Sequence, residues 1–213
     1  KYTLEDFRGC YCVAGIDLSQ TTDLTAASVV IEKQKKLYIF TQFFMSKDRF
    51  DKACAEDSVP YGIYVKQGFL ILSGEHFVDY KDVFNWFVML VKQYKIRPLK
   101  VGYDRYSAQY LIQDLAQAGF HVDDVYQGTN LSPILDEFEG LLKDKSISIG
   151  ANNLLKSHLL NVAVQINSGD GRKKPVKIEA RMRIDGFVSV IDAMTVRSKY
   201  YSEIGKQLEN KAA

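Results

Sequence analysis

The sequence predicts an α/β fold in which a mixed sheet, three antiparallel strands followed by parallel ones, is flanked by helices. Near the N-terminus, short runs rich in β-branched and aromatic residues follow one another with only brief polar turns between them, as in consecutive antiparallel strands. Further along, strand-like runs alternate with segments whose apolar residues recur at helical spacing. The composition, 46% apolar and 25% charged among 213 residues with a net charge of +2, is that of a globular domain with a substantial core.

The antiparallel part is predicted to comprise residues 11–18, 24–32 and 36–44, because the intervening turns are too short for a crossover connection. A helix is expected at 46–57. It is followed by a looser, glycine-containing stretch in which residues 69–72 form a small strand.

The parallel part follows a long amphipathic helix at 80–94. A strand at 99–103, a helix at 107–118 that stops at Gly119, and a strand at 120–126 predict parallel pairing. The remaining elements are helices at 131–143, 152–165 and 184–203, a short strand at 146–149, and a turn at 168–171 whose flanks could pair as a hairpin. Antiparallel strands first and parallel strands after is the order of the RNase H-like sheet.

We expect residues 1–213 to form one such domain, with a lead-in segment at 1–10 and a disordered tail at 205–213. Because the chain begins at Lys1 rather than at Met, it is expected to be the C-terminal part of a longer polypeptide. Neither G-x-x-x-x-G-K-[ST] nor G-x-G-x-x-G occurs, so a nucleotide-driven motor would lie elsewhere. No apolar run reaches the roughly 18 residues that span a bilayer, and no secretory signal is evident, which indicates a cytosolic protein. The cysteines expected to be reduced are Cys10, Cys12 and Cys54.

Three acidic residues stand where chemistry is expected. Asp17 ends the first apolar strand, Asp104 follows the strand at 99–103, and Asp185 opens the closing helix. Each also has an ordinary structural explanation: a turn residue for Asp17, a helix N-cap for Asp104 and a favourable helix-dipole contact for Asp185. In an RNase H-like sheet, however, the strands bearing Asp17 and Asp104 are adjacent, and a closing helix that crosses them could bring Asp185 close.

Converging carboxylates with no Lys or Arg between them repel one another, and divalent cations relieve that repulsion. Mg²⁺ binds carboxylates, water and phosphate oxygens, and two such ions about 3.5–4 Å apart can activate a water molecule and stabilise a leaving 3′ oxygen. The three acids therefore predict a site for two divalent ions, Mg²⁺ or Mn²⁺, that hydrolyses phosphodiesters.

Several motifs, in order, resemble the nuclease domain of the large terminase subunit of tailed bacteriophages, a branch of the RNase H-like superfamily. The resemblance extends from residue 11 to about residue 201. Its motifs are GIDLS at 15–19, DLTA at 23–26, VGYD at 101–104, QG at 127–128, LS at 131–132 and RIDGF at 183–187.

The resemblance implies a metal-dependent endonuclease that cleaves double-stranded concatemeric viral DNA during genome packaging, in the cytoplasm of the bacterial host. It implies that Asp17, Asp104 and Asp185 are the catalytic carboxylates and metal ligands. It also implies an ATPase domain in the N-terminal part of the parent chain, a small terminase subunit and a portal as partners, and no contact with a membrane.

Three further positions are considered beside this set. Asp192 lies seven residues after Asp185, on the same face of the predicted helix, and could replace it as the third ligand, although the motif favours Asp185. Asp23 is expected to form a turn. His158 is expected to pack within its helix and to take no part in catalysis.

A basic run precedes the closing helix. Six Lys or Arg residues lie within 172–183 and are opposed only by Glu179. A solvated hairpin is the ordinary explanation of such a run. This one leads directly into Asp185, which favours contact with the phosphates of DNA. The residues expected to bind DNA are Arg105, Arg172, Lys173, Lys174, Lys177 and Arg181. Arg105 could instead pair with a neighbouring carboxylate.

Two other classes of protein remain as alternatives. The GIDLSQTT segment at 15–22 resembles the phosphate loop of sugar-kinase-like and actin-like ATPases, but 213 residues leave no room for the second domain of that fold. A non-catalytic DNA-docking module with the same sheet is the other alternative, which the presence of all three acids disfavours.

Overall fold

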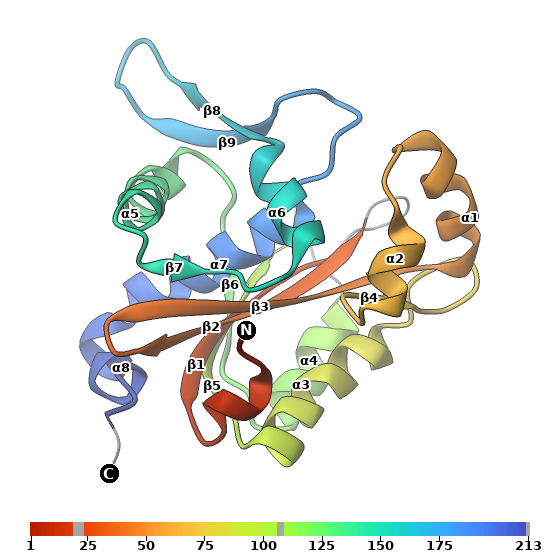
Figure 1. Ribbon diagram of the computed structural model, residues 1–213. Helices are drawn as coiled ribbons and strands as arrows, with labels where there is room; N and C mark the ends of the chain where they lie inside the picture. Colours follow the sequence, from red (N-terminus) through yellow and green to blue (C-terminus); the bar gives the residue numbers. More distant parts are fainter. Residues whose placement is uncertain (19–23, 106–108, 212–213) are drawn as a thin grey trace.

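The computed structural model describes residues 1–18, 24–105 and 109–211. Its middle layer is a seven-stranded sheet with helices on both faces (Figure 1). The strands run in the order β4-β3-β2-β1-β5-β6, and β7 pairs with β3 outside this path. They are β1 (Tyr11–Asp17), β2 (Thr25–Lys33), β3 (Lys36–Met45), β4 (Leu70–Leu72), β5 (Arg97–Asp104), β6 (Val122–Val125) and β7 (Ile147–Ser148).

Strand β1 is the point at which the sheet changes from antiparallel to parallel pairing. It pairs antiparallel with β2, and β2 pairs antiparallel with β3. On its other side β1 pairs parallel with β5, and β5 pairs parallel with β6. The predicted RNase H-like sheet is confirmed, and the carboxyl ends of β1 and β5 lie next to each other.

The helices begin and end where local signals place them. Ser46 caps the first turn of α1 by accepting a hydrogen bond from the Arg49 amide, and Asp79 caps α3 through the Lys81 amide. Gly119, with φ of +97°, lies just beyond α4 in the left-handed conformation that glycine adopts readily. The α-helices are α1 (Lys47–Glu56), α2 (Tyr61–Lys66), α3 (Tyr80–Tyr94), α4 (Gln109–Gln117), α5 (Ser132–Lys143), α6 (Asn153–Leu160), α7 (Asp185–Lys199) and α8 (Tyr201–Leu208). Two 3-10 turns are η1 (Leu4–Phe7) and η2 (Thr129–Leu131).

The alternation of side chains along β1 divides the core in two. Cys12, Ala14 and Ile16 pack toward α3 and α4 on one face. Val13 packs on the other face with the buried side of α7 and with α5 and α6. Two of the cysteines, Cys10 and Cys12, are buried on the α3 side and unpaired, in agreement with the expected reduced thiols.

Three expectations about the elements are wrong in part. The helix predicted at 152–165 ends at Leu160, because the β-branched segment that follows pairs as β8 (Val162–Ile166) with β9 (Lys173–Lys177) in a hairpin. The closing helix breaks at Tyr200 into α7 and α8. The tail expected to be disordered from 205 instead continues α8, where Leu208 is buried.

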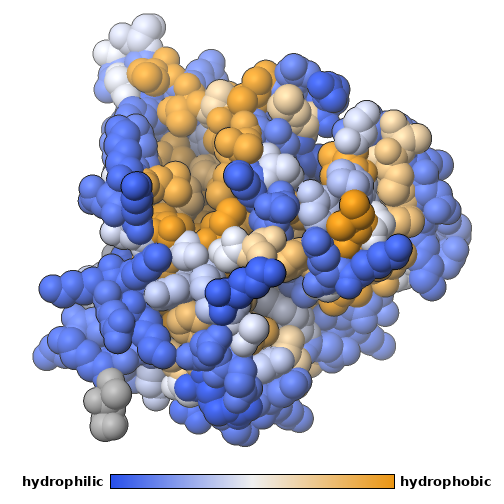
Figure 2. All heavy atoms as spheres, viewed as in Figure 1, coloured by the Kyte–Doolittle hydropathy of each residue, from blue (hydrophilic) through white to orange (hydrophobic). Residues whose placement is uncertain are grey.

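The β8–β9 hairpin is separate from the seven-stranded sheet and covers one side of an apolar hollow. The hollow lies between β8–β9 and α5 and has a volume of about 500 Å³. Figure 2 shows the apolar surface gathered there. Its lining includes Phe138, Leu142, Val164 and Ile166. In the described residues no helix is long and apolar enough to cross a membrane.

Candidate active site

Two glycines allow helix α7 to lie directly on the sheet. Gly15 on β1 and Gly102 on β5 are register partners. A Cβ atom on Gly15 would come within 1.9 Å of the Ser189 carbonyl oxygen, and one on Gly102 within 2.5 Å of the Asp192 carbonyl oxygen. Only hydrogen atoms fit between the strands and the helix backbone at these two positions, so α7 is held against the carboxyl-terminal halves of β1 and β5.

Strand alternation then sets the direction of the acidic side chains. Asp17 is the last residue of β1, two residues after Gly15, and Asp104 is the last residue of β5, two residues after Gly102. Residues two apart on a strand share a face, so both acids belong to the α7 side of the sheet. The first turn of α7 supplies Asp185 and its third turn supplies Asp192.

Asp17 is the electrostatic centre of this group. Burial raises the pKa of Asp17 well above its usual value, and the nearby carboxyl groups of Asp185, to which it is hydrogen-bonded, Asp192 and Asp104 raise it further. The other three acids predicted at the strand ends and on the closing helix therefore all lie close enough to Asp17 to act on its carboxyl group.

Asp192 is the most deeply placed of the four. It is fully buried, and its Oδ1 accepts a hydrogen bond from Nε2 of Gln127, in the loop after β6. Its Oδ2 is buried and has no hydrogen-bond partner among the residues that the structure describes. Burial raises the pKa of Asp192 well above its usual value, the Gln127 bond opposes that rise, and the charge of Asp104 adds to it. An orphaned, buried carboxylate oxygen fits the ligand set of a hard cation.

The acids lie near one another but do not form a ready-made metal cage within the part of the chain that the structure describes. Among residues 1–18, 24–105 and 109–211, no three His, Cys, Asp or Glu side chains are grouped tightly enough to hold a metal ion by themselves. Asp23, predicted as a turn residue, lies outside the described residues.

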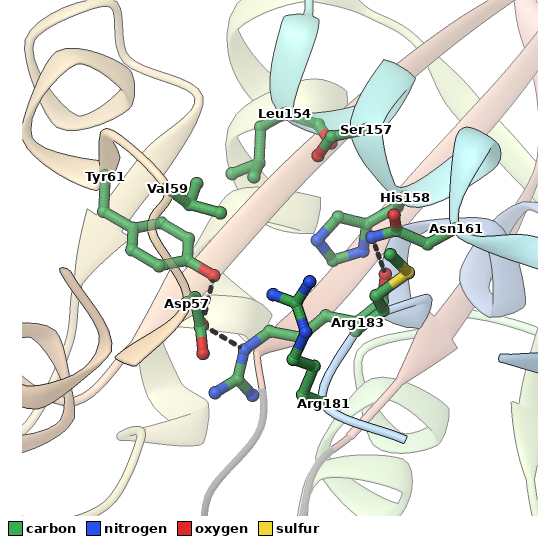
Figure 3. Close-up of a pocket in the computed structure, with 10 residues that line it drawn as sticks. Asp57, Val59, Tyr61, Leu154, Ser157, His158, Asn161, Arg181 and Arg183 are labelled. Atoms are coloured by element: carbon green, nitrogen blue, oxygen red, sulfur yellow. Dashed lines mark hydrogen bonds and ion pairs between the residues drawn. The ribbon is translucent and has the colours of Figure 1, made fainter. Parts of the chain in front are cut away.

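The N-terminal end of α7 is fixed by a buried ion pair. The Arg183 guanidinium lies 2.7 Å from Asp57, which also accepts a hydrogen bond of 2.7 Å from the Tyr61 hydroxyl (Figure 3). Burial by itself would raise the pKa of Asp57, but the hydrogen bonds from Arg183 and Tyr61 outweigh it and lower that pKa. The pair links the end of α1 to the segment that enters α7. Arg183, counted by sequence in the basic run, is thus withdrawn from the surface.

His158 supports the same helix end. Its Nδ1 accepts a hydrogen bond of 3.0 Å from the Gly186 amide, and its ring packs on Phe43. Burial, reinforced by the nearby charge of Arg183, lowers the pKa of His158 to about 3, so the ring is neutral. The packing role predicted for His158 is confirmed, and the structure adds that His158 holds the first turn of α7. His158 and Arg183 border a cavity of about 140 Å³, together with Asp57 and Tyr61 (Figure 3).

The basic residues in and after the hairpin differ in whether an acidic side chain pairs with them. Nζ of Lys173 lies 2.6 Å from Asp136 on α5, and Arg181 lies 2.9 Å from Glu179. Arg172 lies 3.7 Å from Asp170 in the turn. The remaining two basic residues of the hairpin, Lys174 and Lys177, are exposed.

Arg105 follows β5 directly, beside the acidic cluster. It lies 3.0 Å from Asp124 and 5.5 Å from the centre of the Tyr126 ring. The alternative considered from the sequence, pairing with a neighbouring carboxylate, is therefore present. This contact leaves the side chain about half exposed at the same edge of the sheet.

The sheet order, the crossing helix, two acids at the carboxyl ends of adjacent strands and two more on that helix define an RNase H-like domain with an acidic site. The family model for the terminase large subunit endonuclease domain matches residues 2–200. The chain belongs to this family.

Relatives and solved structures agree with this assignment. The chain is 24% identical to the large terminase subunit of Enterobacteria phage HK97 over 201 residues, 92% of this chain and 39% of the relative. It is 27% identical to the large subunit of Lactococcus phage SK1, covering 91% of this chain and 36% of that one. The chain thus spans less than half the length of these relatives.

Two crystal structures share the fold. The HK97 large terminase superposes with a TM-score of 0.77 at 22% identity, over 91% of this chain and 42% of that one. The large terminase nuclease of the thermophilic phage G20c, with bound magnesium, superposes with a TM-score of 0.56 at 11% identity, over 87% of this chain and 80% of that one.

Proposed function

We propose that this domain is a metal-dependent endonuclease that cuts double-stranded, concatemeric viral DNA during genome packaging. The observation that carries the proposal is the acidic cluster on one face of the sheet: Asp17 and Asp104 end two adjacent parallel strands, and burial and its acidic neighbours raise the pKa of Asp17. Carboxylates held close together repel one another, and a divalent cation between them relieves that repulsion. Membership of the terminase endonuclease family supports the same activity.

Asp17, Asp104 and Asp185 are proposed as catalytic residues and as ligands of two divalent ions, Mg²⁺ or Mn²⁺, with Asp192 as the alternative third ligand. The bound ions would supply an activated water and charge stabilisation for the leaving 3′ oxygen. The carboxylates orient this assembly, and the helix beneath them fixes their spacing. The magnesium found in the G20c nuclease supports the choice of ion.

DNA is proposed to approach along the edge that carries the basic side chains. Arg105 lies at this edge beside Asp104, and the hairpin carries further positive charge. Each phosphate neutralised by Lys or Arg releases counterions, which gives affinity without sequence preference. The proposed DNA contacts are Arg105, Arg172, Lys173, Lys174, Lys177 and Arg181. Because Lys173 is paired with Asp136, Lys174 and Lys177 are the hairpin residues best placed to reach a phosphate.

The partners proposed for the parent protein follow from the family. They are an N-terminal ATPase domain, the small terminase subunit and the portal, acting in the cytoplasm of the bacterial host. The length of the relatives supports further domains in the parent chain, since only about two fifths of the HK97 subunit is covered.

Cleavage of supercoiled plasmid in Mn²⁺ tests the proposal. The domain is expected to give nicked and linear DNA without ATP, and Asp17→Asn, Asp104→Asn and Asp185→Asn are each expected to abolish cutting while stability is kept or raised, because a repelling charge is removed. Asp192→Asn is expected to be milder at saturating metal. Folded wild-type protein that binds DNA but never cuts it, over a range of Mn²⁺ and Mg²⁺ concentrations, would instead indicate a docking module.

A further inference from the structure

Among the described residues, Gln127 is the only one recorded as donating a hydrogen bond to the Asp192 side chain. It lies two residues beyond Val125, whose side chain is in the α7 core, so strand alternation continues toward α7 into the loop. The loop itself is held by a hydrogen bond of 3.0 Å from Nδ2 of Asn130 to the Tyr126 carbonyl oxygen. Gln127 is therefore presented to Asp192 from a fixed backbone.

The two oxygens of Asp192 have different surroundings. Oδ1 accepts a hydrogen bond from Gln127, whereas Oδ2 is buried and no residue within 1–18, 24–105 or 109–211 donates to it. The Asp192 backbone cannot shift toward the sheet, because its carbonyl oxygen already lies against Gly102. With the backbone fixed, the Gln127 bond determines the rotation of the carboxyl group and hence the position of Oδ2.

A buried carboxylate oxygen without a donor is expensive unless it meets a cation. Asp192 lies directly against Gly15 and Gly102, the glycines two residues before Asp17 and Asp104. Its carboxyl group also interacts electrostatically with both acids, so a cation held at these strand ends would be close to Asp192. If Gln127 served only to satisfy the buried Asp192 carboxyl group, this would explain the hydrogen bond to Oδ1. It would not explain why no described residue donates to Oδ2.

We propose that Gln127 is a positioning residue that orients Asp192, so that Oδ2 faces a divalent cation bound at the carboxyl ends of β1 and β5. This inference rests on the proposed function, since it assumes that the acidic cluster binds metal. It makes Asp192 a ligand in addition to Asp185, and it gives the QG segment at 127–128 a physical role. Partners that orient a ligand typically change metal affinity by about 10–100-fold.

The test is a double-mutant cycle on Mn²⁺ affinity, measured by isothermal titration calorimetry on the whole chain without DNA. Gln127→Met keeps the length of the side chain and removes the donor. Asp192→Asn keeps an acceptor for Gln127 and removes the charge. Each is expected to weaken Mn²⁺ binding about tenfold or more, and the double variant should bind no more weakly than Asp192→Asn alone, because Gln127 acts through Asp192.

Two controls separate this inference from its alternatives. Gln117→Met, the same change at an exposed position on α4, should leave affinity unchanged. Melting in EDTA reports folding independently of metal, and Asp192→Asn should melt at or above the wild-type temperature, since it relieves repulsion.

Two results would overturn the inference: wild-type Mn²⁺ affinity in Gln127→Met, whether or not that variant melts earlier, or additive losses of affinity in the double variant. If the wild type binds Mn²⁺ and Asp17→Asn does not, the proposed metal site stands whatever the Gln127 result. If the wild type binds no Mn²⁺, both proposals are wrong.

Discussion

Replacing Gly15 by Ala should separate helix α7 from the sheet. The added Cβ would lie 1.9 Å from the Ser189 carbonyl oxygen and 2.5 Å from the Ala193 amide nitrogen, whereas ordinary contact begins at 3.4 Å. Because both neighbours are backbone atoms, no side chain can rotate away. The helix must move by about 1.5 Å, the difference between 1.9 and 3.4 Å.

Overpacking of a core typically destabilises by about 1–3 kcal/mol, and a backbone clash of this depth belongs at the upper end. For a domain of this size we expect the melting temperature to fall by roughly 6–12 °C. The same movement carries Asp185 and Asp192 away from Asp17, and a misplacement of about 1 Å can lower a rate about 100-fold. Plasmid cleavage should therefore fall by about that factor at temperatures where the variant is still folded.

Thermal melting in EDTA and a plasmid cleavage assay measure the two effects. The matched control is Gly140→Ala on α5, where an added Cβ meets no atom within 4 Å. That change should stabilise the helix by up to about 1 kcal/mol and leave cleavage unaltered. A Gly15→Ala variant with wild-type melting and wild-type cleavage would refute the claim that close packing of α7 sets the geometry of the acids.

Three further predictions concern the hairpin, the buried ion pair and the buried histidine. Changing Lys174 and Lys177 to Ala should weaken duplex binding in Ca²⁺ and flatten the plot of log affinity against log salt by about one to two units, as fluorescence anisotropy would show; an unchanged slope would place the DNA elsewhere. Arg183→Met removes the cationic partner of the Asp57 carboxylate and should lower the free energy of unfolding, measured in urea, by about 3–5 kcal/mol. Adding Asp57→Leu should recover most of this loss. Equal stability of the single and double variants would contradict the prediction. Burial lowers the pKa of His158 to about 3, so between about pH 6.5 and 3 the unfolded chain binds a proton on this residue and the folded chain does not. The free energy of unfolding should therefore fall as the pH drops through this range, and it should fall less in His158→Gln. Identical pH profiles of urea unfolding in the two proteins would disprove the assignment.

Much of the fold could be predicted because the local signals are consistent. The strand runs of β1, β2 and β3, and the helical spacing of α3, agree with the structure to within one or two residues. Residues 162–165 are the end of the helix predicted at 152–165, but the turn at 168–171 also indicates that its flanks could pair as a hairpin. The structure follows the second signal, because residues 162–166 pair with residues 173–177 as β8 and β9.

In the site, too, some features could be predicted from the sequence and others could not. The adjacency of β1 and β5 follows from the sheet order, so the proximity of Asp17 and Asp104 could be predicted. The burial of Arg183 could not, because it depends on Asp57, which lies 126 residues earlier in the sequence. Gln127 carries one usable signal, its even spacing from Val125, but the depth of Asp192 beneath it depends on how closely α7 approaches the glycines.

Helix α7 is at once the most enclosed helix of the domain and the carrier of two of the four acids. Its amides should exchange with solvent only when the whole domain unfolds, since no smaller opening frees a helix packed against β1, β2 and β5. The relative positions of the acids are thus tied to the cooperative stability of the fold. A partner could restrain cutting by controlling the entry of DNA, but it could not do so by loosening the carboxylates without unfolding the domain.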